Sequence, residues 1–249
     1  MYKFRQYEMN TNKNMNNDET RIITLSDLNW NKDITRYEIN DLIVSINDLH
    51  AKYLFILGNI TNYNNLQDLL FQKKLKYFFD LLSTFTKTYL VFGKKDYEIK
   101  DNEDNKKYVS IDNLISIYKQ FNVNYLDNSY LEDTDTNIFG LNLDPNKHYN
   151  FEDKKNKIKE LMERLSNVIN NQNFNILCTH ADISALKNDL ELLKYFNLIV
   201  SKGNYNIPKP SIFNKKKIEN KDEIFNKVII ENKGLYNKEE MDLIKIMKI

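Results

Sequence analysis

Short apolar runs alternate with amphipathic segments along the first half of the chain. Three of these runs, 21–26, 53–57 and 89–92, are typical of buried strands. Between them, apolar residues recur at helical spacing over 37–50 and 66–85. This succession of strand, helix and strand predicts a parallel sheet that is covered by helices.

The second half of the chain has more strands and shorter connections. The same patterns predict helices over 111–118 and 151–169, and strands over 123–126, 137–143, 175–179, 198–201, 227–231 and 242–247. The last two strands are separated by the turn signal Asn232-Lys233-Gly234, which predicts an antiparallel end of the chain. We therefore expect two mixed sheets that pack together, with helices outside them.

The beginning of the chain lacks this patterning. Residues 9–19 are so rich in Asn and so poor in apolar side chains that burial cannot offset the entropy lost on ordering them. We expect a flexible lead-in over 1–20 and one domain over 21–249. No segment approaches the roughly 18 consecutive apolar residues of a membrane span, and the N-terminus has no apolar signal region, so we expect a cytoplasmic protein.

Composition restricts the chemistry that is available. Lys and Arg number 36 against 35 Asp and Glu, so the net charge of +1 implies neither a nucleic acid nor a membrane as partner. The single cysteine, Cys178, excludes an intrachain disulfide, and its apolar surroundings predict a buried packing thiol. The chain has only three histidines, His50, His148 and His180, which excludes any mechanism that needs four imidazoles. Its 38 Asn and 32 Lys, against 3 Ala, indicate a bias toward A/T-rich codons.

Polar residues follow five of the apolar runs. Because loops from several parallel strands converge beyond their carboxyl ends, we expect a ligand site there. The five tips are Ser26-Asp27-Leu28-Asn29, Gly58-Asn59-Ile60-Thr61, Gly93-Lys94-Lys95-Asp96, Thr179-His180-Ala181-Asp182 and Ser201-Lys202-Gly203-Asn204-Tyr205.

In their order and setting, the five tips resemble the signature of calcineurin-like metallophosphoesterases: D-x-H, G-D, G-N-H-D, a lone H after a strand, and G-H-x-H. ITLSDLNWN is similar to the family's ITLSDLHLG, YLVFGKKDYE to VLGNHDY, and LIVSKGNYNIPKP to LVLSGHTHGGQ. The resemblance covers about residues 21–249. It implies an α/β fold, a four-layer α-β-β-α sandwich of two mixed β-sheets, and an ancestral hydrolysis of phosphoesters by two divalent metals.

Most metal-ligand positions of that signature are substituted. Asp27 and His180 match ligands, whereas Asn29 stands where a histidine belongs and Asn59 replaces the bridging aspartate. Two of seven ligand positions are thus retained. The full set with its catalytic imidazole needs five histidines, two more than the chain has.

The catalytic position and the last motif are also changed. Lys94 occupies the position of an asparagine ligand, and Lys95 that of the catalytic histidine. Asp96 is retained, although its counterpart in the family orients that missing histidine. Lys202 and Tyr205 lie in the last motif, from which both histidine ligands are gone.

The lysines at the tips have two interpretations. An ammonium group of Lys94 or Lys95 near Asp27 or Asp96 would replace the metal charge, because a buried carboxylate needs a positive partner. Alternatively, the tips hold a phosphate-bearing ligand without hydrolysing it. The ligand-binding residues would then be Lys94, Lys95, Lys202 and Tyr205.

We therefore expect a protein that has lost two-metal hydrolysis and acts as a non-catalytic binding or regulatory pseudoenzyme. No cofactor is expected; if one binds, it is a single divalent Mn, Fe or Zn ion at Asp27, Asn29, Asn59 and His180. Such an ion would support the first alternative, a weak phosphomonoesterase or phosphodiesterase. The second alternative is a scaffold that contacts a partner protein through its helices.

Overall fold

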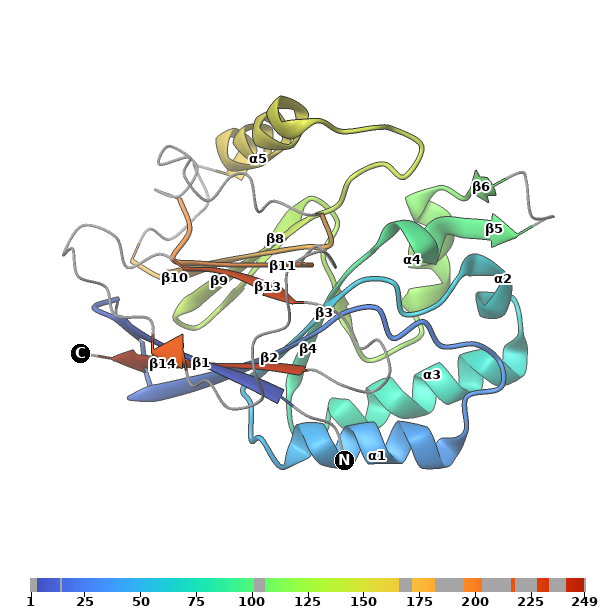
Figure 1. Ribbon diagram of the computed structural model, residues 1–249, viewed down its shortest axis with the longest axis horizontal. Coiled ribbons are helices and arrows are strands. Elements are labelled where there is room, and N and C mark those ends of the chain that lie inside the picture. Colours follow the sequence, from blue (N-terminus) through green and yellow to red (C-terminus); the bar gives the residue numbers. More distant parts are fainter. Residues whose placement is uncertain are drawn as a thin grey trace.

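Two β-sheets lie face to face at the centre of the molecule (Figure 1). The computed structural model describes residues 4–13, 15–100, 106–165, 172–181, 195–202, 216–217, 228–232 and 241–248. The protein is a mixed α/β structure whose helices lie outside the sheets. The predicted α/β class is confirmed.

The larger sheet has seven strands among the described residues. In spatial order they are β12 (Lys216–Lys217), β1 (Phe4–Thr11), β14 (Met241–Lys248), β2 (Glu19–Leu25), β3 (Tyr53–Leu57), β4 (Lys87–Val91) and β7 (Asn124–Tyr125). Neighbouring strands run parallel except β14 and β2. Strand β3 is buried along its whole length because both faces of the sheet are covered, which explains its continuous apolar run.

The smaller sheet has five strands in the same described ranges. Their order is β13 (Val228–Asn232), β11 (Leu198–Lys202), β10 (Phe174–Thr179), β9 (Thr136–Leu141) and β8 (Ser129–Asp133). Only the hairpin of β8 and β9 is antiparallel among these pairs. A separate antiparallel ribbon pairs β5 (Glu98–Lys100) with β6 (Lys106–Tyr108).

Helices connect many of these strands. They are α1 (Arg36–Asn47), α2 (Tyr63–Leu66), α3 (Leu69–Leu82), the 3₁₀ helix η1 (Lys94–Tyr97), α4 (Ile111–Tyr118) and α5 (Phe151–Leu165). A capping box between Thr35 and Glu38 starts α1. The predicted helix over 66–85 is divided into α2 and α3 because the Asp68 carboxylate caps α3 by accepting two backbone N–H groups. None of the described helices has the length and apolar character needed to cross a lipid bilayer.

Three apolar clusters hold these layers together. The first lies between the sheets and joins Phe55 of β3 and Tyr89 of β4 to Ile176 of β10. The second packs α1, α3 and α4 against the opposite face of the larger sheet. The third packs Ile158 and Leu161 of α5 against the outer face of the smaller sheet. Figure 1 shows this arrangement, with α1 and α3 below the larger sheet and α5 above the smaller one.

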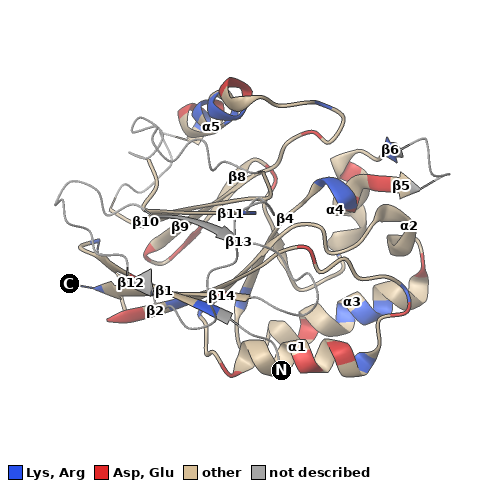
Figure 2. Ribbon diagram, in the orientation of Figure 1, with Lys and Arg blue, Asp and Glu red and all other residues tan. Residues whose placement is uncertain are grey.

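Charged residues of both signs are mixed over the helices (Figure 2). On α5, Lys157 forms an ion pair with Glu160 at 2.5 Å. On α3, Lys76 pairs with Asp80 at 2.9 Å. Such exposed pairs contribute little to stability, but their mixture agrees with the net charge of +1.

The structure differs from the sequence-based expectation at both ends of the chain. Residues 4–11, which were expected to belong to a flexible lead-in, form β1, pair with β14 along their whole length and bury Met9. Backbone pairing stabilises this strand although it has few apolar side chains. The predicted antiparallel pairing of the last two strands is wrong, because β13 joins β11 in the smaller sheet and β14 joins the larger one. A turn signal indicates a local reversal but not the sheet that each flanking strand joins.

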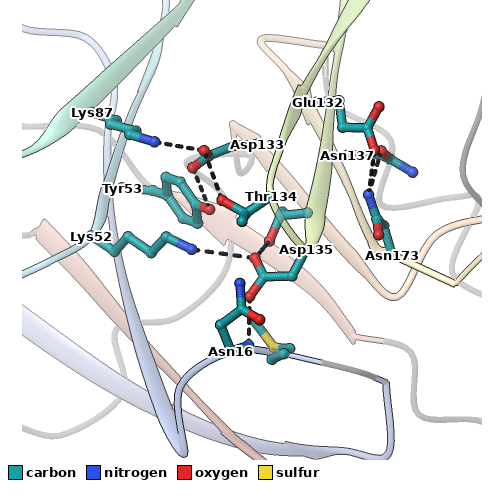
Figure 3. Close-up of polar contacts among 12 residues, drawn as sticks. Asn16, Lys52, Tyr53, Lys87, Glu132, Asp133, Thr134, Asp135, Asn137 and Asn173 are labelled. Carbon is teal, nitrogen blue, oxygen red and sulfur yellow. Dashed lines mark hydrogen bonds and ion pairs between the residues drawn. The ribbon is translucent and has the colours of Figure 1, made fainter.

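A polar network links the two sheets at the turn between β8 and β9 (Figure 3). The Asp133 carboxylate accepts hydrogen bonds from the Tyr53 hydroxyl at 2.8 Å and from the Lys87 ammonium group at 2.6 Å. Asp135 accepts from Lys52 at 3.2 Å and from the backbone N–H of Asn16 at 2.7 Å. Burial alone would raise the pKa of Asp133, but the hydrogen bonds from Lys87 and Tyr53 lower it below its ordinary value. The network therefore favours the ionised form of Asp133.

Replacing Tyr53 by Phe tests this link between the sheets. The substitution keeps the buried ring and removes the hydroxyl that donates to Asp133. We expect the free energy of unfolding to fall by about 1–2 kcal/mol, as for the loss of a hydrogen bond to a charged group. Urea denaturation measures the change. Tyr37→Phe is the matched control, because Tyr37 is 79% exposed; equal effects of the two variants would contradict the link.

Candidate functional site

The carboxyl ends of strands from both sheets meet at one cluster of polar side chains. Strands β2, β3 and β4 of the larger sheet lead into Asp27, Asn59 and Asp96. Strands β10 and β11 of the smaller sheet lead into His180 and Lys202. Hydrogen bonds connect these residues directly or through the backbone of a neighbouring tip. These five residues therefore lie in one cluster.

The backbone at the first two tips has an unusual conformation. Asp27, Asn29 and Asn59 have φ angles of 55°, 50° and 56°, and Gly58 has φ of 75°. Asp and Asn tolerate this left-handed region better than other residues with a side chain. The N–H groups of Asp27 and Asn29 donate to the carbonyl oxygens of Gly58 and Asn59, which holds the two tips together. Backbone strain of this kind is concentrated at functional sites in proteins.

Two glycines permit the close approach of the tips. A Cβ atom on Gly58 would lie 2.3 Å from the backbone nitrogen of Gly93. A Cβ atom on Gly93 would lie 2.4 Å from Asn59 Oδ1 and 2.7 Å from His180 Nδ1. Because these distances are far below van der Waals contact, any side chain at either position would force the tips apart.

The Asp27 carboxylate is the centre of the cluster and is 1% exposed. Its Oδ1 atom accepts a hydrogen bond from the Asn59 side-chain amide at 2.6 Å. The same atom accepts from the Lys202 ammonium group at 3.0 Å. Lys202 thus supplies a positive charge to Asp27 from the other sheet, a role that the sequence analysis had considered only for Lys94 and Lys95.

The two lysines of the third tip lie in different environments. The Lys95 ammonium group donates to Asn29 Oδ1 at 2.7 Å, and the Lys95 backbone N–H donates to Asn59 Oδ1 at 2.9 Å. Lys94 is exposed, and its ammonium group lies 5.2 Å from the centre of the Tyr108 ring in a cation–π contact. The structure therefore places Lys95 within the cluster and Lys94 outside it.

Asp96 supports the backbone of the tips and is fully buried. Its carboxylate accepts from the N–H groups of Asn59 at 2.7 Å, Gly93 at 2.8 Å and Thr61 at 3.2 Å. Burial raises the pKa of Asp96 to about 7, although the backbone N–H groups oppose the rise. Asp96 thus orients the loops after β3 and β4 through their backbone.

His180 is held by a backbone carbonyl. Its Nδ1 atom lies 2.6 Å from the Leu57 oxygen, and because a carbonyl only accepts, Nδ1 carries the proton. Burial and the nearby Lys202 charge lower the pKa of His180 to about 4, against the opposing effects of the Leu57 carbonyl and Asp27. His180 is therefore neutral near pH 7, with the lone pair on Nε2.

Other candidates from the sequence lie elsewhere. Cys178 is 2% exposed in the apolar cluster between the sheets, and burial raises the pKa of its thiol. This agrees with a packing role. His50 and His148 are exposed, and among the described residues no hydrogen bond or ion pair joins either side chain to the tips. Tyr205 lies outside the described residues, so the structure does not place it.

The sequence predicts that the residues of the five tips are poor in metal ligands. Their polar atoms can be compared with the requirements of a two-metal centre. Such a centre needs several oxygen and nitrogen lone pairs directed at a shared space. Over the ranges that the structure describes, no group of three or more His, Cys, Asp or Glu side chains could hold a metal ion. Asp27 Oδ1 receives an amide and an ammonium group, and Asn29 Oδ1 receives another ammonium group. These residues do not fit a two-metal centre.

Some contacts of the cluster have no signal in the sequence. The carbonyl of Leu57 and the N–H of Thr61 act through the backbone, which every residue carries. Lys202 was assigned to the fifth tip, but its partner on another sheet could be identified only after the sheets were placed. Residue type and strand order locate such a site, whereas the direction of each side chain depends on packing.

Comparisons with known proteins add only a distant likeness. No protein-family model matches the sequence, and no curated protein matches it. Among solved structures, the chain is similar to a phosphopantetheinyl hydrolase from Mycobacterium tuberculosis, with a TM-score of 0.46 and 12% identity, covering 79% of this chain and 86% of that chain. It is also similar to a dimetal phosphatase from Danio rerio, with a TM-score of 0.44 and 10% identity, covering 74% and 81%. TM-scores below 0.5 carry no functional argument.

The titrations of Asp96 and His180 predict opposite effects of pH on stability. The folded pKa of Asp96, about 7, lies above its ordinary value of 3.8, so its contribution to stability is lost as the pH rises from 4 to 7. The folded pKa of His180, about 4, lies below 6.5, so its contribution is lost as the pH falls from 6.5 to 4. Each effect has a limit of about 1.4 kcal/mol per pH unit.

Single variants separate the two effects. Relative to the unmodified protein, Asp96→Asn is expected to lose stability more steeply on acidification from pH 7 to 4, because only the His180 effect remains. His180→Gln is expected to become relatively more stable over the same range. Chemical denaturation at a series of pH values measures the stability of the unmodified protein and of both variants. An equal pH dependence of stability in all three proteins would contradict the assignment of these effects to Asp96 and His180.

Proposed function

We propose that this protein is a calcineurin-like metallophosphoesterase in fold, with a four-layer α-β-β-α sandwich, that has lost two-metal hydrolysis and acts by binding. The two sheets with helices on their outer faces and the meeting of strand ends from both sheets support the fold assignment. In this proposal the protein is a non-catalytic binding or regulatory protein.

One contact carries the proposal: the Lys202 ammonium group lies 3.0 Å from Asp27 Oδ1. In the resembled family, Asp27 would hold a metal ion. Here a positively charged group of the chain itself balances the buried carboxylate, so no ion is needed for charge neutrality. A metal would have to displace this ammonium group before it reached the carboxylate.

The asparagines strengthen this argument. An aspartate at position 59 would present only lone pairs, whereas Asn59 presents an N–H group to Asp27 at 2.6 Å. The oxygen of Asn59 accepts from the Lys95 backbone, and the oxygen of Asn29 accepts from the Lys95 ammonium group. The polar atoms of the cluster therefore satisfy one another instead of facing a shared ion.

The binding role in this proposal uses the charged rim of the same cluster. Lys95 and Lys202 are only partly buried, so two positive charges lie at the edge of the cluster. A phosphate-bearing ligand would suit two such groups. Lys94 is left out of this ligand site because it lies over Tyr108.

A second candidate function is weak hydrolysis with a single Mn, Fe or Zn ion. The observation that favours it is the hydrogen bond from His180 Nδ1 to the Leu57 carbonyl, since metal-binding histidines commonly donate their other N–H in this way. This candidate requires the ion to replace Lys202 at Asp27.

A double-mutant cycle tests the role of Lys202. We expect Lys202→Met to lower the free energy of unfolding by about 3 kcal/mol, because it leaves the Asp27 charge buried without its ammonium partner. In the double variant Asp27→Asn and Lys202→Met, most of that loss is expected to be recovered. Urea denaturation gives the coupling energy. Lys94→Met is the matched control and should change stability by less than about 0.5 kcal/mol; additive effects at positions 27 and 202 would contradict the pair.

Metal content and turnover decide between the two candidate functions. We expect far less than one Mn, Fe or Zn ion per chain after purification. With bis(p-nitrophenyl) phosphate and added Mn²⁺, we expect no turnover above that of a His180→Ala variant prepared in parallel. Turnover that His180→Ala abolishes would overturn the pseudoenzyme proposal and establish the weak hydrolase.

A further inference from the structure

A cavity lined by both polar and apolar residues lies against η1 and the start of α4. Its volume is about 420 Å³, within the range of small-molecule sites. It is lined by Tyr97, Val109, Ser110, Ile111, Asp127, Asn128, Asn142, Leu143, Asp144, Pro145 and Asn146. These residues come from η1, from the start of α4 and from the segments after β7 and β9. None of the residues that make up the tip cluster lines it.

Tyr97 contributes a phenol side chain to the wall of this cavity. Its side chain is 3% exposed, and its ring packs edge-on against Phe92. Within the described residues no hydrogen bond involves its hydroxyl. Burial, and then the charges of Asp96, Asp127 and Asp144, raise the pKa of Tyr97. The hydroxyl therefore stays neutral near pH 7, and Tyr97 belongs to the same cavity wall as Asp127 and Asp144.

The charge of the cavity wall has one sign. Asp127 and Asp144 line it, and no Lys, Arg or His does, although 36 of the 249 residues are Lys or Arg. Asp127 accepts from the side-chain amides of Asn128 at 3.2 Å and Asn142 at 3.3 Å. Asp144 accepts from the backbone of Asn146 at 2.9 Å. Neutral amide donors hold these carboxylates in place without cancelling their charge.

Basic residues approach from outside the wall, where Arg164 donates to the backbone carbonyl of Asn128 and Lys147 reaches Asp144. Lys147 lies 3.8 Å from Asp144 in an ion pair whose lysine side chain is 68% exposed, so solvent screens it. The N-terminus of α4 also borders the cavity at Ser110 and Ile111. Asp112 in the first turn of α4 offsets the positive end of that helix. The charged side chains that line the cavity itself are Asp127 and Asp144.

The rest of the wall is apolar. Val109, Ile111, Leu143 and Pro145 contribute hydrocarbon surface next to the two carboxylates. A ligand that suits this wall has an apolar body and donates hydrogen bonds from a positive group. Phosphate and carboxylate groups are disfavoured here because they would meet two like charges.

We propose that this cavity binds a small organic cation, a primary amine carried on an apolar body, between Tyr97, Asp127 and Asp144. The ammonium group donates to the two carboxylates and to the Tyr97 hydroxyl oxygen, and the apolar body packs on Leu143 and Pro145. The proposal is independent of the proposed function, because the cavity and the tip cluster share no residue and the test measures no turnover.

Calorimetric titration with three probes of similar shape tests the proposal: benzylamine, benzyl alcohol and benzoate. Benzylamine is expected to bind with a Kd of about 1 mM or tighter, and the other two at least about tenfold more weakly. Asp127→Asn and Asp144→Asn keep an acceptor oxygen and remove the charge, and each is expected to weaken benzylamine binding by about tenfold. Tyr97→Phe is expected to weaken it by about threefold.

Asp48→Asn is the control, because it removes the same charge from an exposed position at the end of α1. It is expected to leave benzylamine binding unchanged. Circular dichroism of each variant checks that the fold is retained. The proposal is overturned if benzylamine does not bind up to about 10 mM, if benzoate binds equally well, or if Asp127→Asn and Asp144→Asn bind benzylamine like Asp48→Asn.

Discussion

A carboxylate buried at the end of β2 is the constraint on which the site depends. An uncompensated charge in a protein interior costs several kcal/mol, so Asp27 requires a positive partner. Lys202 provides it from the smaller sheet, and Asn59 adds a hydrogen bond from within the larger one. The pair therefore joins the two sheets at the carboxyl ends of their strands, as Asp133 and Tyr53 join them at the turn between β8 and β9. The apolar cluster that contains Phe55, Tyr89 and Ile176 also packs the two sheets together.

The asparagines explain how the site can change its chemistry while it keeps its shape. Asn59 and Asn29 adopt the left-handed conformation that the tips require, and Asn accommodates it nearly as well as Asp. Compared with a carboxylate, an amide replaces one acceptor oxygen by a donor nitrogen. That single change turns a group that would attract a cation into one that donates to Asp27. A cluster of mutually satisfied donors and acceptors follows at the tips.

Much of the fold could be predicted from the sequence because the buried strands carry a continuous apolar signal, as β3 does. The elements that were missed depend on pairing instead. Strand β1 has mostly polar residues and is stabilised by its register with β14, and the partner of β13 is set by a sheet that forms elsewhere. In the site, Asp27, Asn59 and His180 follow the carboxyl ends of buried strands, where the sequence analysis sought a ligand site. Lys94 and Lys95 could not be distinguished, because successive residues of a 3₁₀ turn point in different directions and only packing decides which one enters the cluster.

The contact between Gly58 and Gly93 has a consequence for how this sequence can evolve. The chain has 38 Asn and only 5 Gly, a composition that favours A/T-rich codons, yet two of the glycines lie where a single methyl group would collide with a neighbouring tip. An exchange between Asn and Asp at position 29 or 59 changes a functional group and keeps the left-handed backbone, whereas any substitution at the two glycines must move the backbone. Mutations in this region therefore change the functional groups of the side chains more readily than they change the path of the main chain.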